Sequence, residues 1–369
     1  MPRVGRMIVI AAVLGVLVIP GRLAAAPQRA PAHLSRRTAT VGPQLDRYLA
    51  GLSRKAQFSG AVAIAKHGTI LFSHGYGMAD RAHHVPNRPD TRYLLPGVSH
   101  SFSILAIVQL LQRGRVKLGD AICTYIAGCP ASWRHVTIQS LETGRAGLPN
   151  VDWPSARSFN QAYATCKATP LGLDPGIQAH FGNCGTYMRA AIIQHVTGLP
   201  WATYLQANVW RPAGMAHTGR LTTALKPPQR AAAYSGGGPG KNGGYNNHYA
   251  AYSTVLDVER YDRALFGGKL LGSTWLRTML TPQAVVEPPD PSDPKTMPAA
   301  KHLEYGYFWK IGSLFGHRVI YTADEGNSFR AINLHLSDDG VDIVVVSNDD
   351  MNQIGRVAQE IARLTLHAS

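Results

Sequence analysis

The chain has 369 residues, of which 45% are hydrophobic, and its formal net charge at pH 7 is +15. This apolar content is ordinary for a globular protein, and the length allows a sizeable core in two domains or in one domain with an inserted helical half. Lys and Arg are scattered along the chain. A solvated surface is therefore the default interpretation, attraction to anionic cell-envelope polymers is a weaker one, and nucleic-acid binding is not expected.

Residues 1–26 have the pattern of an export signal. Two arginines precede an apolar run at 7–19, and three alanines at 24–26 supply small residues for cleavage. The run is shorter than the roughly 20 residues that span a bilayer, so a cleaved signal is favoured over an uncleaved anchor. The sequence predicts a periplasmic or secreted protein with no membrane span in the mature chain. Residues 27–42, rich in Ala, Pro and Arg, are predicted to be a linker.

The first predicted elements are a helix, a hairpin and a second helix. Apolar residues recur at helical spacing over 41–53. Segments 58–66 and 69–74 are typical of strands, and the His67-Gly68 pair between them favours a hairpin. Pro96-Gly97 then breaks the chain before a helix that is expected to end near residue 113 and to bury one apolar stripe.

The rest of the chain divides into a mostly helical middle and a strand-rich end. Residues 236–244 are Gly-rich without a phosphate-loop pattern, and residues 282–298 are Pro-rich and predicted to be a surface loop. The clearest helices of the middle are expected at 186–196, 201–209 and 255–266. Three strands and a closing helix are expected at 319–322, 329–336, 342–347 and 354–366.

These elements predict one discontinuous α/β (α+β) domain over residues 43–369. Residues 43–95 and about 300–369 would form an antiparallel sheet half with the terminal helices on its face, and about 96–299 a mostly helical half. A cleft between the two halves is the default ligand site.

The four cysteines form two local pairs, Cys123 with Cys129 and Cys166 with Cys184. Four cysteines allow three connectivities, and the sequence alone does not select one. Export permits oxidation and each local pair encloses a short loop, so we predict these two bridges. Neither pair has Cys-x-x-Cys spacing. No metal and no cofactor is expected.

Short motifs over about residues 43–366 have an order and spacing that resemble a known family. The motifs are Phe58-Ser59-Gly60-Ala61-Val62, Gly75-Tyr76-Gly77-Met78-Ala79-Asp80, Pro89-Asp90-Thr91-Arg92-Tyr93, Gly147-Leu148-Pro149, Arg211-Pro212-Ala213-Gly214-Met215 and Tyr252-Ser253-Thr254. They resemble the serine β-lactamase-like family of class C β-lactamases, D-alanyl-D-alanine carboxypeptidases and related esterases. The resemblance implies a β-lactamase/transpeptidase-like fold, in which an antiparallel sheet with flanking helices carries a helical subdomain.

The family's chemistry uses three motifs around a cleft, and this chain differs from the family at key positions of all three. Aligned on Phe102, the nucleophilic Ser of Ser-x-x-Lys is Gly97 and the Lys is His100. The Tyr of Tyr-x-Asn is Phe181, which keeps the ring but has no hydroxyl for proton transfer. Asn183 of that motif is retained.

The third motif, Lys-Thr-Gly or His-x-Gly, corresponds to Thr322-Ala323-Asp324 beside Glu325. An acid therefore stands where the resemblance implies a group that binds a substrate carboxylate. The turn Thr143-Gly144-Arg145-Ala146-Gly147 also departs from the family pattern. Lys295-Thr296-Met297 looks like the third motif but lies in the Pro-rich loop, and we interpret it as a chance match.

Two functions are compatible with these changes. The first is a non-catalytic cell-envelope pseudoenzyme that binds a cell-wall peptide, a small molecule or a protein partner, with an undefined oligomeric state. Its cleft would be formed by Gly97, His100, Phe181, Asn183, Thr322, Asp324 and Glu325.

The second function is an active serine hydrolase of esterase, peptidase or β-lactamase type with relocated residues. Ser99, Ser101 or Ser103 would be the nucleophile and His100 the base, oriented by Asp324 or Glu325. Neighbours on a helix point about 100° apart, so Ser99 and His100 do not face each other. Helix capping by the serines and pocket filling by His100 are the simpler interpretations.

Restoring the motif residues tests whether the cleft survives. The triple change Gly97→Ser, His100→Lys and Phe181→Tyr is expected to give slow hydrolysis of a small neutral ester. Asp324 would still repel an anionic substrate. Gly97→Ser is destabilising if φ at this position is positive.

Overall fold

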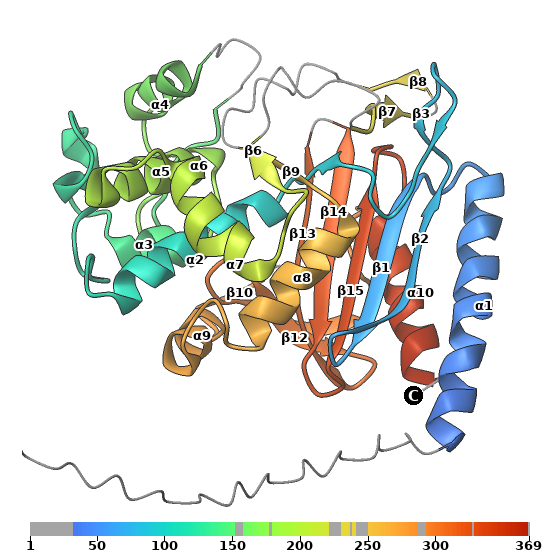
Figure 1. The fold of residues 1–369 in the computed structure, drawn as a ribbon. Coiled ribbons are helices and arrows are strands. Elements are labelled where there is room, and N and C mark those ends of the chain that lie inside the picture. The colour runs from blue at the N-terminus through green and yellow to red at the C-terminus, as the bar shows by residue number, and fades with distance from the viewer. Residues whose placement is uncertain are drawn as a thin grey trace, which may run out of the picture.

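The fold is seen in a computed structural model, shown in Figure 1. It describes residues 32–151, 158–176, 179–220, 230–236, 238–240, 250–286, 293–326 and 328–367, with side chains from residue 41 onward. The predicted export signal at 1–26 lies outside the described residues.

The central element is an antiparallel sheet with eight strands in the described part of the chain. Its order is β10-β11-β12-β13-β14-β15-β1-β2, so the N-terminal hairpin is added to the last strand, with Gly60 opposite Ser347. The strands are β1 (Gly60–Lys66), β2 (Thr69–Tyr76), β10 (Ala284–Val285), β11 (Ala300–Tyr305), β12 (Lys310–Leu314), β13 (His317–Gly326), β14 (Phe329–Leu336) and β15 (Val341–Ser347).

Helices cover both faces of this sheet. Because both faces are buried, β1 and β15 are nearly continuous apolar runs rather than alternating ones. Helices α1 (Ala32–Arg54) and α10 (Ile354–His367) lie along one face, and α8 (Val255–Phe266) crosses the other (Figure 1). In α10 the buried Ile354, Val357 and Ile361 follow helical spacing, which turns one stripe of the helix towards the sheet.

The helical half packs on the face that carries α8 (Figure 1). A π-helical segment, Gln206–Trp210, joins two of its helices. Its helices are α2 (Val98–Gln112), α3 (Ile138–Glu142), α4 (Phe159–Ala168), α5 (Asn183–Thr197), α6 (Trp201–Leu205), α7 (Arg211–Ala213) and α9 (Ser273–Met279). Short strand pairs complete the fold: β3 (Met78–Asp80) with β4 (Val85–Pro86), β7 (Tyr234–Ser235) with β8 (Gly238–Pro239), and β9 (Ala251–Ser253) with β5 (Tyr93–Leu94) and β6 (Gly219–Arg220).

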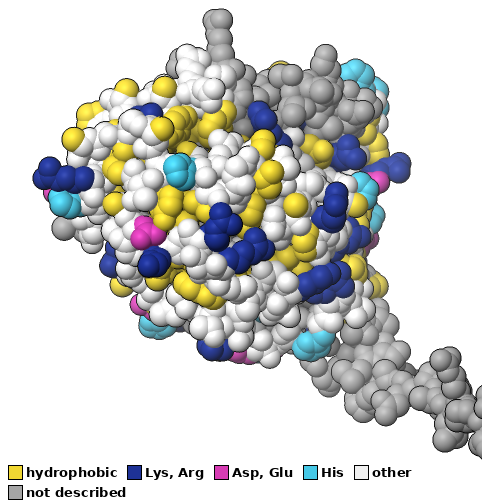
Figure 2. All heavy atoms as spheres, turned by 60° about the vertical axis from the view of Figure 1, so that its left-hand side comes forward, with side chains coloured by type: hydrophobic (Ala, Val, Ile, Leu, Met, Phe, Trp, Pro, Cys, Tyr) yellow, Lys and Arg dark blue, Asp and Glu magenta, His cyan; other side chains and the backbone are white. Residues whose placement is uncertain are grey.

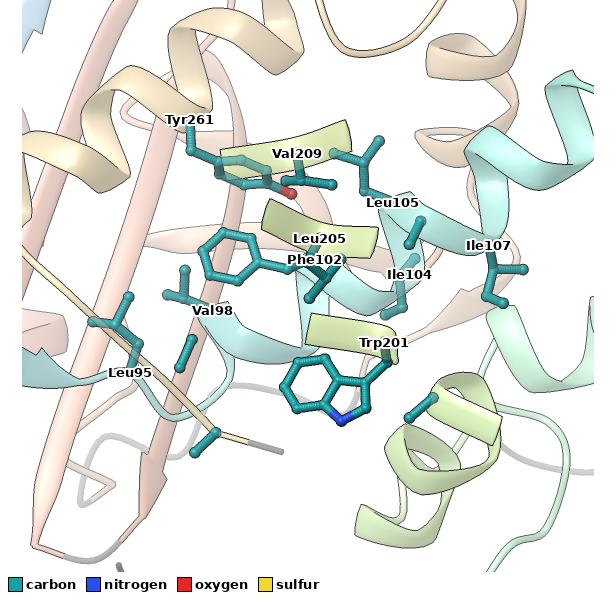
Figure 3. Packing of buried hydrophobic residues seen from close by; sticks show 14 of the residues in the cluster. Leu95, Val98, Phe102, Ile104, Leu105, Ile107, Trp201, Leu205, Val209 and Tyr261 are labelled. Carbon is teal, nitrogen blue, oxygen red and sulfur yellow. The ribbon is translucent and has the colours of Figure 1, made fainter. Parts of the chain in front are cut away.

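Helix α2 is buried on all sides instead of along the single stripe expected from its sequence. Every residue from Val98 to Leu111 is buried. Phe102 packs edge-on against Tyr261, with ring centroids 4.8 Å apart (Figure 3). It also packs edge-on against Trp210 at 6.1 Å. The helix lies between the sheet and α5 and α6, so its whole circumference meets protein. Its first turn, where the first motif falls, is therefore held rigidly.

Other predicted elements agree with the structure or differ from it for simple reasons. The hairpin 58–74, the helix 255–266 and the strand 329–336 are confirmed. The predicted linker 27–42 is wrong from Ala32 onward, because α1 begins there. Ala, Leu and Arg in this stretch have high helix propensity. No helix within the described ranges is long and apolar enough to cross a membrane.

The two loops set apart by composition are only partly described. The Gly-rich segment contributes β8, which pairs with β7 just before it, and its residues 237 and 241–244 lie outside the described residues. The Pro-rich segment contains β10, which pairs with β11, and its residues 287–292 also lie outside.

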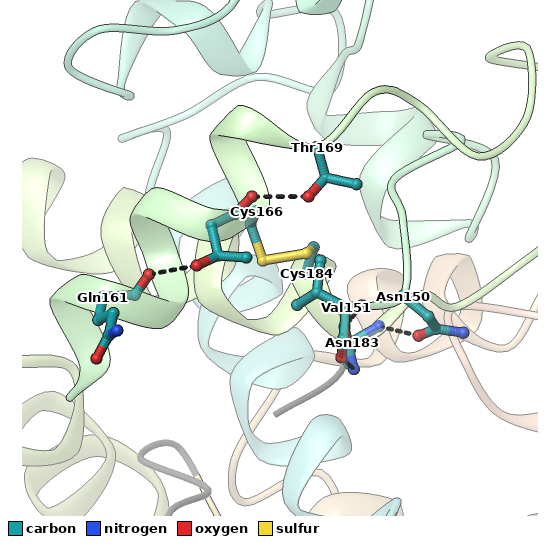
Figure 4. The surroundings of a disulfide bond; sticks show 8 residues. Asn150, Val151, Gln161, Cys166, Thr169, Asn183 and Cys184 are labelled. Atoms are coloured by element: carbon teal, nitrogen blue, oxygen red, sulfur yellow. Dashed lines mark hydrogen bonds between the residues drawn. A yellow bond between two sulfur atoms is a disulfide. The ribbon is translucent and has the colours of Figure 1, made fainter. Parts of the chain in front are cut away.

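Both predicted disulfides, Cys123–Cys129 and Cys166–Cys184, are confirmed. The second joins α4 to the first turn of α5 (Figure 4). Cys166 and Cys184 are fully buried, so this bridge lies inside the core of the helical half.

Replacing Cys166 and Cys184 by Ser is expected to lower the free energy of unfolding by about 2–3 kcal/mol, because the bridge closes a loop that the unfolded chain otherwise samples freely. Urea unfolding of the double variant and of the wild type measures the difference. A Cys123→Ser, Cys129→Ser variant is the control with a shorter loop and is expected to lose less. Equal losses in the two variants would contradict the loop-size argument.

Candidate functional site

Gly97 and Asp324 meet where the first and third motifs converge. Gly97 caps the start of α2 with φ 67° and ψ −58°, a conformation that favours glycine. A Cβ atom placed on Gly97 would lie 2.4 Å from the Cβ atom of Asp324 near the end of β13. The Asp324 side chain thus occupies the space into which a side chain at position 97 would project.

His100 is buried one turn further along α2. Its Nδ1 atom lies 2.9 Å from the Thr186 hydroxyl of α5, and its ring stacks on Phe308 with centroids 5.3 Å apart. Burial, with a smaller effect of the positive Arg189, lowers the pKa of His100 to about 3. The imidazole is therefore neutral at physiological pH and a poor proton acceptor, since a general base works best with a pKa near the working pH.

Phe181 forms an aromatic cluster with two residues of the sheet half. Its ring meets Phe308 edge-on at 5.1 Å and Tyr305 at 5.2 Å between centroids. On its other side it lies against Gly144, where a Cβ atom would come within 2.7 Å of the ring. Gly144, from the turn whose sequence departs from the family pattern, therefore leaves the space that Phe181 fills.

Asn183 holds the backbone of a neighbouring segment. Its side-chain oxygen accepts from the Val151 amide at 3.0 Å, and its side-chain nitrogen donates to the Val151 carbonyl at 2.9 Å (Figure 4). The Asn183 amide nitrogen donates to Asn150 Oδ1 at 2.7 Å. The retained residue of the second motif thus anchors residues 150–151 at the start of α5.

Thr322 begins a buried polar chain. Its hydroxyl donates to Asn333 Oδ1 on the adjacent strand β14, and Asn333 Nδ2 donates to Asp262 Oδ1 of α8 at 2.7 Å. Burial, reinforced by the negative Asp342, raises the pKa of Asp262 well above its usual range. These bonds tie β13, β14 and α8 together behind the site.

The three candidate serines of α2 are buried and bonded to the preceding turn. Ser99 donates to the Leu95 carbonyl at 2.5 Å and accepts from the Ala251 amide at 3.1 Å. Ser101 and Ser103 donate to carbonyls three residues earlier, at 2.7 and 2.9 Å. The structure does not bring any of them to the described pocket, which agrees with a structural role for these hydroxyls.

A pocket of about 250 Å³ opens beside Asp324, at the end of the sheet where β11 ends and β12 begins. Three aromatic rings, two lysines and one carboxylate give it its chemical character. Its lining consists of Ala179, His180, Phe181, Lys295, Tyr305, Phe308, Lys310, Thr322, Ala323 and Asp324.

Glu325, the other predicted acid, is exposed and forms an ion pair with Arg330. The Glu325 amide donates to Asp324 Oδ1 at 2.8 Å. Glu325 does not line the described pocket, and Nδ1 of His100 meets Thr186 rather than a carboxylate. No group of three or more His, Cys, Asp or Glu residues in the described part of the chain is arranged to hold a metal ion.

A model of a known protein family matches most of this chain. The family model described as "Beta-lactamase" matches residues 45–366. The chain belongs to the beta-lactamase family. Among curated proteins it is similar to the putative penicillin-binding protein PbpX of Bacillus subtilis, with 26% identity over 83% of this chain and 75% of PbpX.

Two solved structures share the beta-lactamase-family fold. The octameric penicillin-binding protein homologue of Pyrococcus abyssi has a TM-score of 0.76 and 18% identity, covering 88% of this chain and 77% of that one. The D-amino acid amidase of Ochrobactrum anthropi, in complex with D-phenylalanine, has a TM-score of 0.72 and 17% identity, covering 88% of this chain and all of that one.

Some residues of this family member's candidate site were not identified from the sequence. Lys295 lines the pocket. Interpreting Lys295-Thr296-Met297 as a chance match gave no reason to expect it there. Lys310, Tyr305 and Phe308 reach the pocket from outside the family motifs, and no periodicity identifies them. Thr186 was identified only as part of a predicted helix. A hydroxyl beside a buried His commonly provides the hydrogen-bond partner of a ring nitrogen, as Thr186 does for His100.

Proposed function

We propose that this member of the beta-lactamase family is an exported, non-catalytic protein that binds a ligand in its cleft. One observation carries the proposal: position 97 is a glycine with positive φ, and Asp324 fills the space where a nucleophilic side chain would stand. Catalytic residues act as a unit, so loss of a covalent nucleophile removes most of the rate acceleration.

The other groups near α2 also support a non-catalytic role. His100 has a strongly lowered pKa because it is buried, so it is a weak base. The hydroxyls of Ser99, Ser101 and Ser103 already donate to backbone carbonyls. Relocated serine hydrolase chemistry would need one of them to leave its bond and to meet a base.

Export and ligand type are supported by separate observations. The N-terminal pattern of arginines, apolar run and alanines is that of an export signal, and the two disulfides suit an oxidising compartment. The related amidase holds D-phenylalanine in its solved structure. A ligand of the amino-acid or short-peptide class, such as a cell-wall peptide, therefore suits the cleft.

The purified protein is expected to form no covalent adduct with benzylpenicillin or with a fluorophosphonate, because position 97 offers no nucleophile. Intact-protein mass spectrometry after incubation with each reagent measures this. A catalytically active penicillin-binding protein treated in parallel is the positive control. A stoichiometric adduct mapped to Ser99, Ser101 or Ser103 would overturn the proposal and establish relocated chemistry.

A further inference from the structure

Lys310 presents a cation to the pocket beside Asp324. It stands directly opposite Tyr305 of β11 and Tyr321 of β13, and its Nζ atom lies 6.0 and 5.5 Å from the centres of their rings. Ring faces attract a cation but leave its N–H groups without acceptors. Within the described residues Lys310 makes no hydrogen bond or ion pair, and burial lowers its pKa. An anionic ligand would therefore supply the acceptor that Lys310 lacks among the described residues.

Asp324 presents the opposite charge on the same pocket. Burial raises the pKa of Asp324 to about 6, while the nearby Lys295 and Lys310 oppose that rise. The two lysines are not equivalent, because Lys295 has Asp293 at 3.8 Å whereas Lys310 has no such partner in the described chain. Lys310 and Asp324 influence each other's pKa without forming an ion pair within 4.0 Å.

Besides Lys295, which is paired with Asp293, the pocket has one lysine without an ion-pair partner among the described residues, one carboxylate and aromatic walls, and this combination matches a small zwitterion. Phe181, Tyr305 and Phe308 provide the aromatic walls. Resting on the proposed binding function, the geometry points to an α-amino acid with an apolar or aromatic side chain, or the same groups in a short peptide, as the ligand. Its carboxylate meets Lys310, its ammonium meets Asp324, and its side chain lies among the three rings.

Three probes separate these contacts. Each enantiomer of phenylalanine carries both charges, 3-phenylpropionate only the carboxylate, and phenethylamine only the ammonium. Calorimetric titration of the full-length protein at pH 7.5 is expected to show that at least one enantiomer of phenylalanine binds more tightly than either single-charge probe. Lys310→Met is expected to lower the affinity for phenylalanine and for 3-phenylpropionate about tenfold or more, since a charge-assisted hydrogen bond is lost. The affinity for phenethylamine is expected not to fall.

The second variant tests the other end of the ligand. Asp324→Asn is expected to lower the affinity for phenylalanine and for phenethylamine about tenfold or more. The affinity for 3-phenylpropionate is expected to stay the same or to rise. Lys301→Met, which removes an exposed lysine of β11, is the matched control and is expected to change no affinity. Thermal unfolding of each variant confirms that it is folded, and an unfolded Asp324→Asn is replaced by Asp324→Ser.

The pH dependence of phenethylamine binding distinguishes direct contact with Asp324 from a merely structural role of this residue. Asp324 faces Lys295, Lys310, Asp293 and Arg330, and Glu325 is its chain neighbour. Because its raised pKa leaves it largely protonated at pH 5 and ionised at pH 7.5, phenethylamine affinity is expected to rise over this range. Since His180 also lines the pocket, a His180→Gln background isolates the effect. The rise is expected to disappear in Asp324→Asn.

Failure of this inference differs from failure of the proposed function. No saturable binding of either phenylalanine enantiomer, or affinities that Lys310→Met leaves unchanged, would overturn the zwitterion assignment. The absence of covalent adducts would still stand. An adduct with a fluorophosphonate would overturn the non-catalytic function, whatever the titrations give.

Discussion

The variant Gly97→Ser, His100→Lys, Phe181→Tyr is expected to be inactive on p-nitrophenyl acetate, whereas the same variant with Asp324→Gly is expected to hydrolyse it slowly. The Cβ atom of a residue at 97 would lie 2.4 Å from Asp324 Cβ, closer than two non-bonded carbon atoms approach. The triple change that the sequence alone favours therefore lacks room for its nucleophile. Removing the Asp324 side chain provides that room.

The free energy of unfolding is also expected to be lower in the triple variant than in the quadruple variant. Gly97→Ser in the presence of Asp324 combines an unfavourable positive φ, about 1–2 kcal/mol, with overpacking of about 1–3 kcal/mol. The fourth change is expected to recover the overpacking but not the backbone cost. Urea unfolding and ester turnover at equal folded concentration measure both effects. Asp324→Gly alone is the control for background hydrolysis, and a triple variant as active as the quadruple would contradict the steric argument.

The Arg189→Met variant is expected to lose about 3–5 kcal/mol of folding free energy, because it leaves a buried charge without its partner. Arg189 Nε donates to Glu142 Oε1 at 2.9 Å and Nη2 to the Leu141 carbonyl at 2.6 Å. Both members of this pair are buried, and Glu142 Oε2 has no hydrogen-bond partner among the described residues. Adding Glu142→Leu is expected to recover most of the loss, since an apolar pair replaces the ionic one.

The loss in Arg189→Met is expected to depend on pH. Burial raises the pKa of Glu142 to about 7, against the opposing effect of Arg189, and removing Arg189 raises it further. In the unfolded chain a Glu ionises near pH 4.3, so stability is full below that pH and falls as pH rises through the folded pKa. Urea unfolding at pH 5 and pH 8 is expected to show the larger loss at pH 8. Arg363→Met, at a surface ion pair with Glu360, is the control and is expected to change little at either pH.

The architecture was predictable because its signals are local or repeated. The hairpin turn at His67-Gly68, the periodicity of 255–266 and the spacing of the cysteines each depend on neighbouring residues. The start of α1 was missed because Pro and Arg near residue 31 suggested a linker, whereas the structure continues the helix from Ala32. The composition of a segment does not show where a helix begins when the part of that helix that packs against the core lies later in the sequence.

The candidate site could be predicted from the sequence only where the motifs supplied the positions. Gly97, His100, Phe181 and Asp324 were identified by alignment to Phe102 and Phe329. The alignment could not show that Asp324 fills the space beside Gly97, because that contact depends on how β13 approaches α2. Lys295 was set aside for a similar reason, since its loop returns to the pocket only in the folded chain.

The position of β1 between β2 and β15 determines how this chain is able to fold. Gly60 pairs with Ser347, so the β1 edge of the first hairpin stays unpaired until nearly the whole polypeptide has been synthesised. Contacts this distant in sequence slow folding, and an apolar strand with a free edge is prone to aggregate meanwhile. A chain that ends before Val341 lacks the partner of β1 altogether. The central sheet therefore closes only after synthesis has passed Ser347, so the C-terminal segment sets the point from which β1 is protected.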